Sequence, residues 1–130
     1  PIEYIPSMEL PDEEYPMKMM TGRVLYHYNA CAMTDKTEGL NEISGHSFIE
    51  INTEDAERIG IKDGDRVKVS SRRGSIETTA NVSGKTNPGE CWMPFHFLDG
   101  GANWLTSDAL DSISSTPEYK VCAVKIENTK

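Results

Sequence analysis

The sequence contains no long apolar run and has few basic residues relative to acidic ones. No stretch approaches the roughly 18 apolar residues that a membrane-spanning helix needs, so we expect a soluble protein without membrane insertion. Lys and Arg total 13 against 21 Asp and Glu, which gives a net charge of −8. This excess of negative charge argues against general binding to nucleic acid. An anionic ligand would therefore have to be held by local donors.

Closely spaced cysteines are also missing. Cys31, Cys91 and Cys122 lie far apart and form no C-x-x-C pair, so they do not predict a zinc site. An odd number of cysteines fits a reducing compartment better than a disulfide framework, and we predict a cytoplasmic protein. We expect each thiol to serve as a small apolar side chain in the core.

The common catalytic signatures are absent as well. The chain contains no Gly-x-Ser-x-Gly elbow, no Gly-x-Gly-x-x-Gly fingerprint and no Walker-A spacing. His27, His46 and His96 are spread along the chain without a helical i, i+4 pair, so only the fold could assemble them around a metal. We therefore predict no catalytic residues and no metal ligands in this chain.

The first 20 residues differ from the rest of the chain. They contain four of the seven prolines and the acidic run Asp12-Glu13-Glu14. We predict an extended lead-in or linker over residues 1–20, lying along a surface, and a single domain over residues 21–130. Because the chain opens on proline, we expect it to be a piece of a longer protein.

Short strands with turn signals dominate the remaining sequence. Strands are predicted over 23–28, 47–51, both arms of a hairpin within 62–82, 90–97 and 119–127. Asn52 or Thr53 can cap one short helix that Gly60 ends, and residues 102–110 can add one or two helical turns. This pattern predicts a mainly β protein with a small barrel, because only one strand is followed by a credible helix.

Three loops have the composition of a binding site. Thr21-Gly22-Arg23 combines a flexible backbone, a hydroxyl and a guanidinium, which suits phosphate oxygens, although an ordinary turn has the same composition. The segment PFHFLDGGANWLT (94–106) offers glycines and the amide of Asn103, which can pair with a heterocycle edge, although it also fits a surface loop. Tyr119-Lys120 can place a cation at the same barrel end. We expect SRRG (71–74) to be a solvated hairpin turn.

Four blocks carry a resemblance to a known family. They are TGRVLYHYNACAMT, FIEINTEDAERIGIKDGDRVKVSSRRGSI, FHFLDGGANWLT and TPEYKVCAVKIE, in this order. The chain resembles the C-terminal domain of molybdopterin-dependent oxidoreductases, and most closely that of formate dehydrogenase catalytic subunits. The resemblance implies a six-stranded double-psi β-barrel that helps to hold bis-(molybdopterin guanine dinucleotide), with molybdenum or tungsten held by the cofactor and other domains.

The resemblance also implies a set of cofactor contacts: Gly22, Arg23, His27, Tyr28, Met33, Thr34, His96, Phe97, Gly101, Asn103, Leu105, Tyr119 and Lys120. By their chemistry, Arg23, His27 and Thr34 suit phosphate oxygens. Asn103, Tyr119 and Lys120 suit the polar edge of the pterin. The chain departs from its relatives at Ala30-Cys31, where a Thr/Ser-Gly pair is common, and this can remove one phosphate contact.

The family places its catalytic residues in earlier domains, so this domain is expected to do no chemistry alone. Its implied partners are the preceding domains of the same large subunit and iron–sulfur electron-transfer subunits. Nitrate, arsenate and sulfoxide reductases share the domain, so the substrate stays open between them and formate. A non-catalytic double-psi barrel adaptor is a further alternative, and a self-contained barrel enzyme is disfavoured because no catalytic constellation is present.

Overall fold

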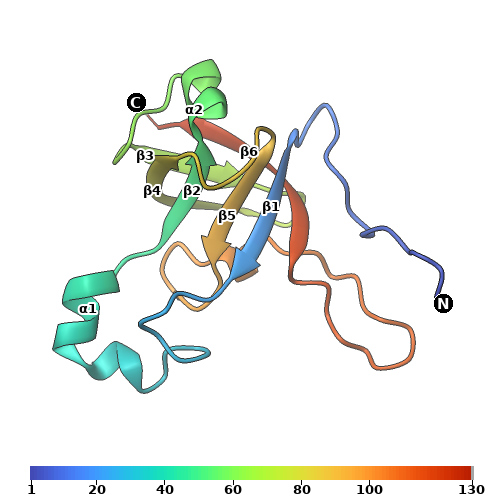
Figure 1. Cartoon of the computed structure of the whole chain (residues 1–130), viewed down its shortest axis with the longest axis horizontal. Helices are drawn as coiled ribbons and strands as arrows, with labels where there is room; N and C mark the ends of the chain where they lie inside the picture. Colours follow the sequence, from blue (N-terminus) through green and yellow to red (C-terminus); the bar gives the residue numbers. More distant parts are fainter. Residues whose placement is uncertain (130) are drawn as a thin grey trace.

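Six short strands close on themselves to form the barrel seen in Figure 1, in a computed structural model that describes residues 1–129. The strands are β1 (Met17–Gly22), β2 (Phe48–Asn52), β3 (Arg66–Ser70), β4 (Ser75–Ser83), β5 (Glu90–Pro94) and β6 (Val121–Asn128). Their spatial order is β1-β5-β2-β4-β3-β6, with β1/β5 and β2/β4 parallel and the other four pairs antiparallel. The fold is a double-psi β-barrel, and the predicted fold class is confirmed.

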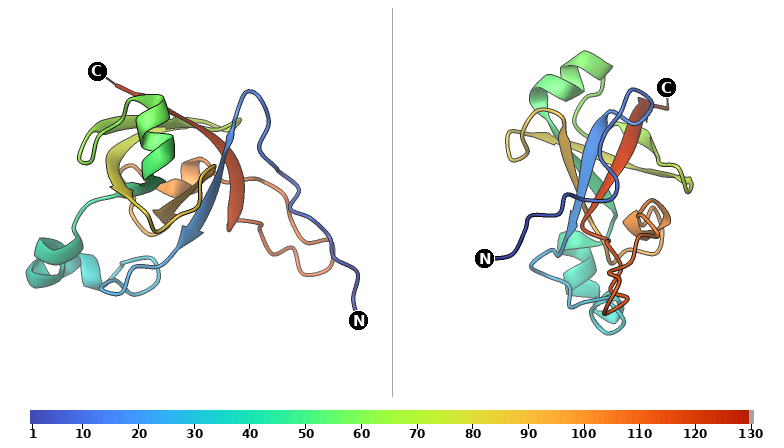
Figure 2. Two further views of the ribbon diagram at one scale, coloured as in Figure 1. Left: turned by 45° about the horizontal axis from the view of Figure 1, so that its top comes forward. Right: turned by 90° about the vertical axis from the view of Figure 1, so that its right-hand side faces the viewer.

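Within residues 1–129, two α-helices and two short 3-10 turns lie in the connections between the strands (Figure 2). The helices are α1 (Glu38–Ser44) and α2 (Thr53–Ile59), and the 3-10 turns are η1 (Thr34–Lys36) and η2 (Ala102–Trp104). The predicted helix is α2: the Asn52 side chain accepts from the Glu54 amide at 2.9 Å, and Gly60 ends it at φ 77°. Helix α1 was not predicted, because it buries no residue and has no side-chain cap.

The first strand lies earlier in the sequence than predicted. Residues 23–28 form no strand, whereas β1 covers Met17–Gly22 and alternates buried with half-buried side chains. Aromatic residues favour strands only where a neighbouring strand can pair with them, and the pairing of β1 with β5 stops at Gly22 and Pro94. Residues 17–20, which we expected in the lead-in, therefore belong to the barrel.

The barrel interior is a single apolar cluster. Its fully buried members include Met17, Met19, Ile49, Ile51, Val67, Val69, Cys91, Met93 and Val124.

All three cysteines are free and buried. Burial raises the pKa of Cys91 and raises that of Cys122 to about 12, so these two thiols are inert core groups, as predicted. Among the described residues, no helix has the length and apolarity needed to cross a bilayer.

The lead-in is attached to the barrel by an ion cluster. The Glu9 carboxylate pairs with Arg72 and Arg73, and its Oε1 accepts from the Ala123 amide of β6 at 2.9 Å. Asp12 pairs with Arg72 as well. SRRG is the hairpin turn between β3 and β4, and Arg72 and Arg73 are exposed, as predicted. Their ion pairs with Glu9 and Asp12 of the lead-in, which lies along this surface, were not predicted.

Replacing Glu9 with glutamine is expected to cost about 1–2 kcal/mol of unfolding free energy at pH 7, because charge-assisted hydrogen bonds are lost. Burial raises the pKa of Glu9, but the bonds from Arg73 and Ala123 outweigh it, so the pKa lies below the ordinary 4.5. The stabilisation is therefore present above pH 4.5 and is lost as the pH falls through the lower folded value. Urea unfolding of the wild-type chain and of Glu9→Gln at pH 7 and pH 3 measures the difference in unfolding free energy. An equal difference at both pH values would contradict the role of the Glu9 carboxylate.

Candidate functional site

Most of the predicted site residues gather at one end of the barrel. Because β1 runs parallel to β5 and antiparallel to β6, the loops after β1 and β5 meet the segment that enters β6. The segment entering β2 joins them, since β2 is antiparallel to β5. In Figure 1 this end is the lower one, with α1 to its left. The double-psi topology thus assembles segments that are distant in the sequence.

Phe95 is the centre of the first side-chain group at this end. The Arg23 guanidinium carbon lies 5.4 Å from its ring centroid, and the Lys120 ammonium lies 5.6 Å from it. The Tyr119 ring packs edge-on against Phe95 at 6.0 Å. The amide nitrogen of Asn103 donates to the Phe95 carbonyl oxygen at 3.2 Å. The Phe95 ring therefore brings together three predicted residues, two of them cationic, and its carbonyl oxygen adds Asn103.

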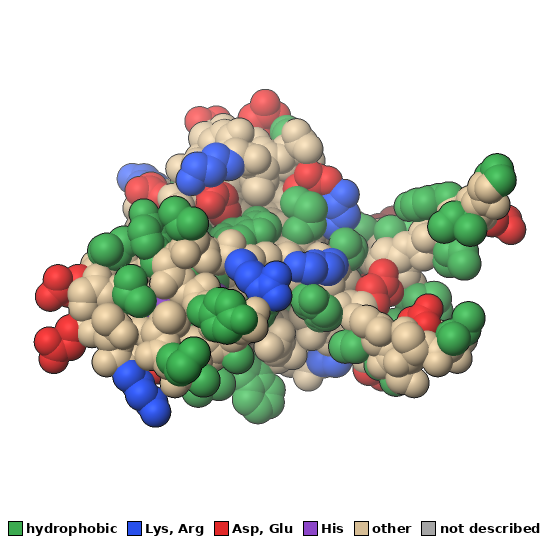
Figure 3. Space-filling model, turned by 60° about the horizontal axis from the view of Figure 1, so that its bottom comes forward, with side chains coloured by type: hydrophobic (Ala, Val, Ile, Leu, Met, Phe, Trp, Pro, Cys, Tyr) green, Lys and Arg blue, Asp and Glu red, His purple; other side chains and the backbone are tan. Residues whose placement is uncertain are grey.

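These cations form a local basic area on an acidic protein. Figure 3 shows this end of the molecule with Lys and Arg side chains gathered near its middle, hydrophobic side chains around them and acidic ones toward the edges. The net charge of the chain is −8, so an anion would have to be held by local donors. The Lys and Arg side chains at this end are such donors. Arg23 is exposed, and its only described hydrogen bond goes to the Asn29 side-chain oxygen at 3.2 Å, so it is accessible to a ligand.

His27 is the centre of a second, buried group. Its Nδ1 lies 3.1 Å from the Thr34 hydroxyl and its Nε2 lies 2.6 Å from the Ser44 carbonyl oxygen. His96 packs against it with ring centroids 5.0 Å apart, and Phe97 lies 4.1 Å from His96. Burial, and after it the electrostatic effect of the neighbouring His27 ring, lowers the pKa of His96, which favours a neutral ring. Both nitrogens of His27 have protein partners, so its predicted role toward phosphate stays a prediction.

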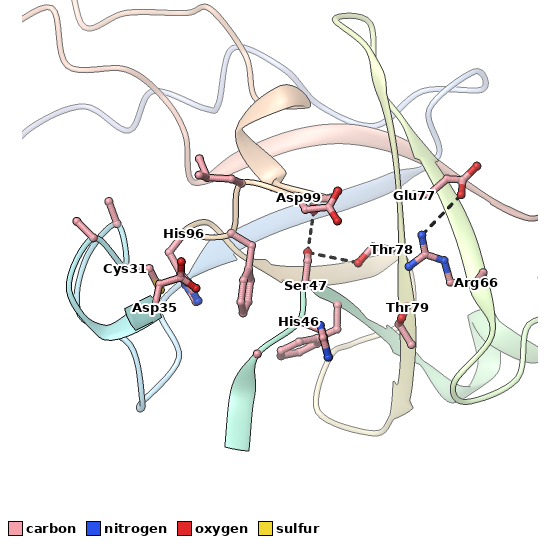
Figure 4. A pocket seen from close by; sticks show the side chains of 17 residues that line it. Cys31, Asp35, His46, Ser47, Arg66, Glu77, Thr78, Thr79, His96 and Asp99 are labelled. Carbon is pink, nitrogen blue, oxygen red and sulfur yellow. Dashed lines mark hydrogen bonds and ion pairs between the residues drawn. The ribbon is translucent and has the colours of Figure 1, made fainter. Parts of the chain in front are cut away.

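A cavity of about 690 Å³ opens beside this buried group. Figure 4 shows its lining, with Cys31 and His96 at one end and the β3–β4 hairpin at the other. The Ser47 hydroxyl donates to the Gly100 carbonyl oxygen at 2.7 Å and accepts from Thr78 at 3.3 Å, which fixes the loop after β5 against β4. The volume is typical of small-molecule sites.

The two predicted glycines are required by close packing. A Cβ at Gly22 would lie 2.6 Å from the Trp92 ring nitrogen. A Cβ at Gly101 would overlap the carbonyl oxygen of Phe97. Gly22 ends β1 and Gly101 lies in the loop after β5, so glycine is needed at both positions for close packing rather than for direct ligand chemistry.

Replacing Gly101 with alanine is expected to lower the unfolding free energy by about 1–3 kcal/mol, because the loop after β5 must move away from Phe97. The matched control is Gly84→Ala, since a Cβ at Gly84 meets nothing within 4 Å. Thermal and urea unfolding of the two variants measure the difference. Equal stability of both variants would contradict this packing.

Besides these two glycines, three predicted residues lie outside the Phe95 and His27 groups. Tyr28 and Met33 are 66% and 71% exposed on the loop after β1, so their side chains are available to a ligand or to another protein surface. Leu105 is fully buried in the core, and its carbonyl oxygen accepts from Arg73 at 2.7 Å. Its side chain therefore has no surface for a ligand in this structure, which corrects its assignment as a contact.

Sequence reasoning missed two residues that organise the site. Phe95 was not among the predicted contacts, although it lies in the same aromatic run as His96 and Phe97. Cys31 was expected to be a core filler, but its sulfur lies within 4.8 Å of ring nitrogens of His27 and His96. No spacing signal could have shown this, because residues 31 and 96 are brought together only by the fold.

Comparison with known proteins gives a consistent family. A sequence model described as "Molydopterin dinucleotide binding domain" matches residues 17–123. The chain is 46% identical over 127 residues to F420-dependent formate dehydrogenase 2 subunit alpha of Methanococcus maripaludis, covering 98% of this chain and 19% of the relative. It is 43% identical over 123 residues to a nitrate reductase of Symbiobacterium thermophilum, covering 92% of this chain and 16% of that protein.

A solved structure agrees on the fold. Acetylene hydratase from Pelobacter acetylenicus aligns with a TM-score of 0.78 at 15% identity, over 89% of this chain and 19% of that one. The chain thus spans about a fifth of the length of its formate dehydrogenase relatives. The matched residues include the first five strands and the start of β6, and the chain belongs to the molybdopterin dinucleotide binding domain family.

Proposed function

We propose that this chain binds the molybdopterin guanine dinucleotide cofactor as one domain of a formate dehydrogenase-like oxidoreductase. The observation that supports this most strongly is the group around Phe95, where Arg23 and Lys120 share one aromatic ring on an otherwise acidic chain. A dinucleotide needs cations for its phosphates and amide or hydroxyl groups for its heterocycles. Both kinds of group meet at one end of the barrel.

The residues present fit this cofactor. Arg23 is exposed and can give a forked hydrogen bond to a phosphate. Asn103 and Lys120 are exposed beside it, and each carries donors that can face a pterin edge. Close packing at Gly22 and Gly101 leaves no room for a side chain there. The bound cofactor would supply the redox chemistry, while this chain would bind and orient it.

Formate is the proposed substrate of the whole enzyme, because three relatives at 43–46% identity are formate dehydrogenase alpha subunits. The alternative is a nitrate reductase, since one such enzyme is 43% identical. The test uses the full-length protein that contains this chain. Formate-dependent reduction of coenzyme F420 or of an artificial acceptor supports the proposal. Nitrate-dependent oxidation of a reduced dye, with no formate activity, would overturn the choice of substrate.

A further inference from the structure

We propose that His27, Cys31 and His96 form a binding site for a single soft or borderline transition-metal ion, with Zn(II) the best match. The three side chains are 5%, 6% and 5% exposed, and their nitrogen and sulfur atoms lie within 4.8 Å of one another. This site is separate from the metal of the family's cofactor. It uses only side chains of this chain.

His96 supplies the first reason to expect a ligand. Its Nε2 is buried and has no hydrogen-bond partner among residues 1–129. A buried polar atom without a partner is uncommon and costs free energy, so such an atom calls for an explanation. A metal ion accepting the lone pair of a neutral imidazole would satisfy it. The ring is held in place by Phe97 and Phe95, which pack against it at 4.1 and 6.5 Å.

Cys31 supplies the second reason. Its φ is 62°, in the left-handed region that favours glycine, and its side chain is nevertheless a buried thiol. The loop around it is closed by main-chain bonds from Cys31 to Tyr28 at 3.0 Å and from Asp35 to Cys31 at 2.9 Å, which direct the thiol inward. A strained backbone that holds a cysteine sulfur within 4.8 Å of nitrogens of two imidazoles indicates a function for the sulfur.

The chemistry of the three ligands selects the ion. One thiolate and two neutral imidazoles suit zinc and copper better than magnesium or calcium, which prefer oxygen. In a tetrahedral zinc site the ligand atoms are roughly 3.3–3.6 Å apart, so side-chain rotations must bring these atoms closer by about 1 Å. The metal would replace one of the two hydrogen bonds of the His27 ring. The other ring nitrogen would keep its bond to Thr34 or Ser44, the second-shell contact that orients metal-bound histidines.

The fourth coordination position would face the cavity. Cys31, His96 and Asp35 all line it, so water or the Asp35 carboxylate can complete the coordination (Figure 4). Three protein ligands and one open position are typical of zinc sites that exchange a ligand. A metal here would tie the loop after β1 to the loop after β5, two segments that both border the proposed cofactor site.

The test is titration of the purified, phosphine-reduced chain with Zn(II) and with Co(II) as a spectroscopic probe. We expect one ion per chain, visible cobalt bands of tetrahedral intensity, and a sulfur-to-cobalt charge-transfer band in the near ultraviolet. No charge-transfer band with the wild-type chain would overturn the proposal. Titration without any nucleotide keeps this result independent of cofactor binding.

The variants separate metal binding from folding. Cys31→Gly relieves the φ of 62° and should fold at least as well as the wild type, yet it should lose the charge-transfer band and weaken zinc binding at least about 100-fold. His96→Ala should weaken binding similarly. The matched control is His46→Ala, because His46 lines the same cavity outside the cluster. Unchanged zinc affinity in Cys31→Gly, or an equal loss in His46→Ala, would overturn the site.

Discussion

Replacing Arg23 with alanine is expected to weaken the binding of guanosine diphosphate, a probe for half of the cofactor, by about 10- to 100-fold. A forked bond from a guanidinium to phosphate contributes roughly 1.5–3 kcal/mol, and each 1.4 kcal/mol is a factor of ten in affinity. Arg23 is the exposed cation above Phe95, with one described hydrogen bond to another side chain. Its removal leaves the barrel core untouched.

Lys62→Ala is the matched control for this prediction. Lys62 is exposed on the turn before β3, at the opposite end of the barrel, and the substitution changes the net charge by the same amount. Isothermal titration calorimetry at one ionic strength measures both variants. Equal losses in the two variants would show that the anion responds to overall charge, which would contradict a local site at Arg23.

Replacing Met19 with alanine is expected to lower the unfolding free energy by about 2–5 kcal/mol. Met19 is fully buried and stands opposite Cys91 of β5 and Cys122 of β6, so it lies between the two neighbours of β1 in the closed barrel. Truncation removes the transfer free energy of the side chain and leaves a cavity. This loss is larger than the losses expected for Glu9→Gln and Gly101→Ala.

Met8→Ala provides the control, because Met8 is 77% exposed in the lead-in and should change stability by less than about 0.5 kcal/mol. Urea unfolding followed by circular dichroism measures both proteins. A loss below about 1 kcal/mol for Met19→Ala would mean that β1 is not held between β5 and β6. The strand order of the closed barrel would then be wrong.

Local signals predicted most of the fold. The cap at Asn52, the stop at Gly60 and the alternation in both arms of the β3–β4 hairpin depend on near neighbours in the sequence, and the structure confirms each. The first strand was misplaced because the aromatic residues of 23–28 have high strand propensity but no strand beside them. Which strands pair depends on the whole barrel. The strand propensity of a single segment gives no information about its pairing partner.

The site was predictable in composition and not in arrangement. Arg23, Asn103 and Lys120 could be chosen from their chemistry and from the family resemblance. That they share Phe95 depends on how β1, β5 and β6 meet at one end. The pairing of Glu9 with Arg73 and the approach of Cys31 to His96 likewise join segments more than 60 residues apart. Such contacts leave no periodic signal in a single sequence.

Amide chemical shifts test most directly whether the loops after β1 and β5 bind a guanine dinucleotide cofactor. We expect guanosine diphosphate, added to the isotope-labelled chain, to shift the amides of residues 22–27 and 101–103, while those of α2 at the opposite end stay unchanged. The same titration with adenosine diphosphate shows whether the shifts depend on the guanine base. No shifts in those two loops at millimolar guanosine diphosphate, or shifts confined to the other end of the barrel, would contradict the account.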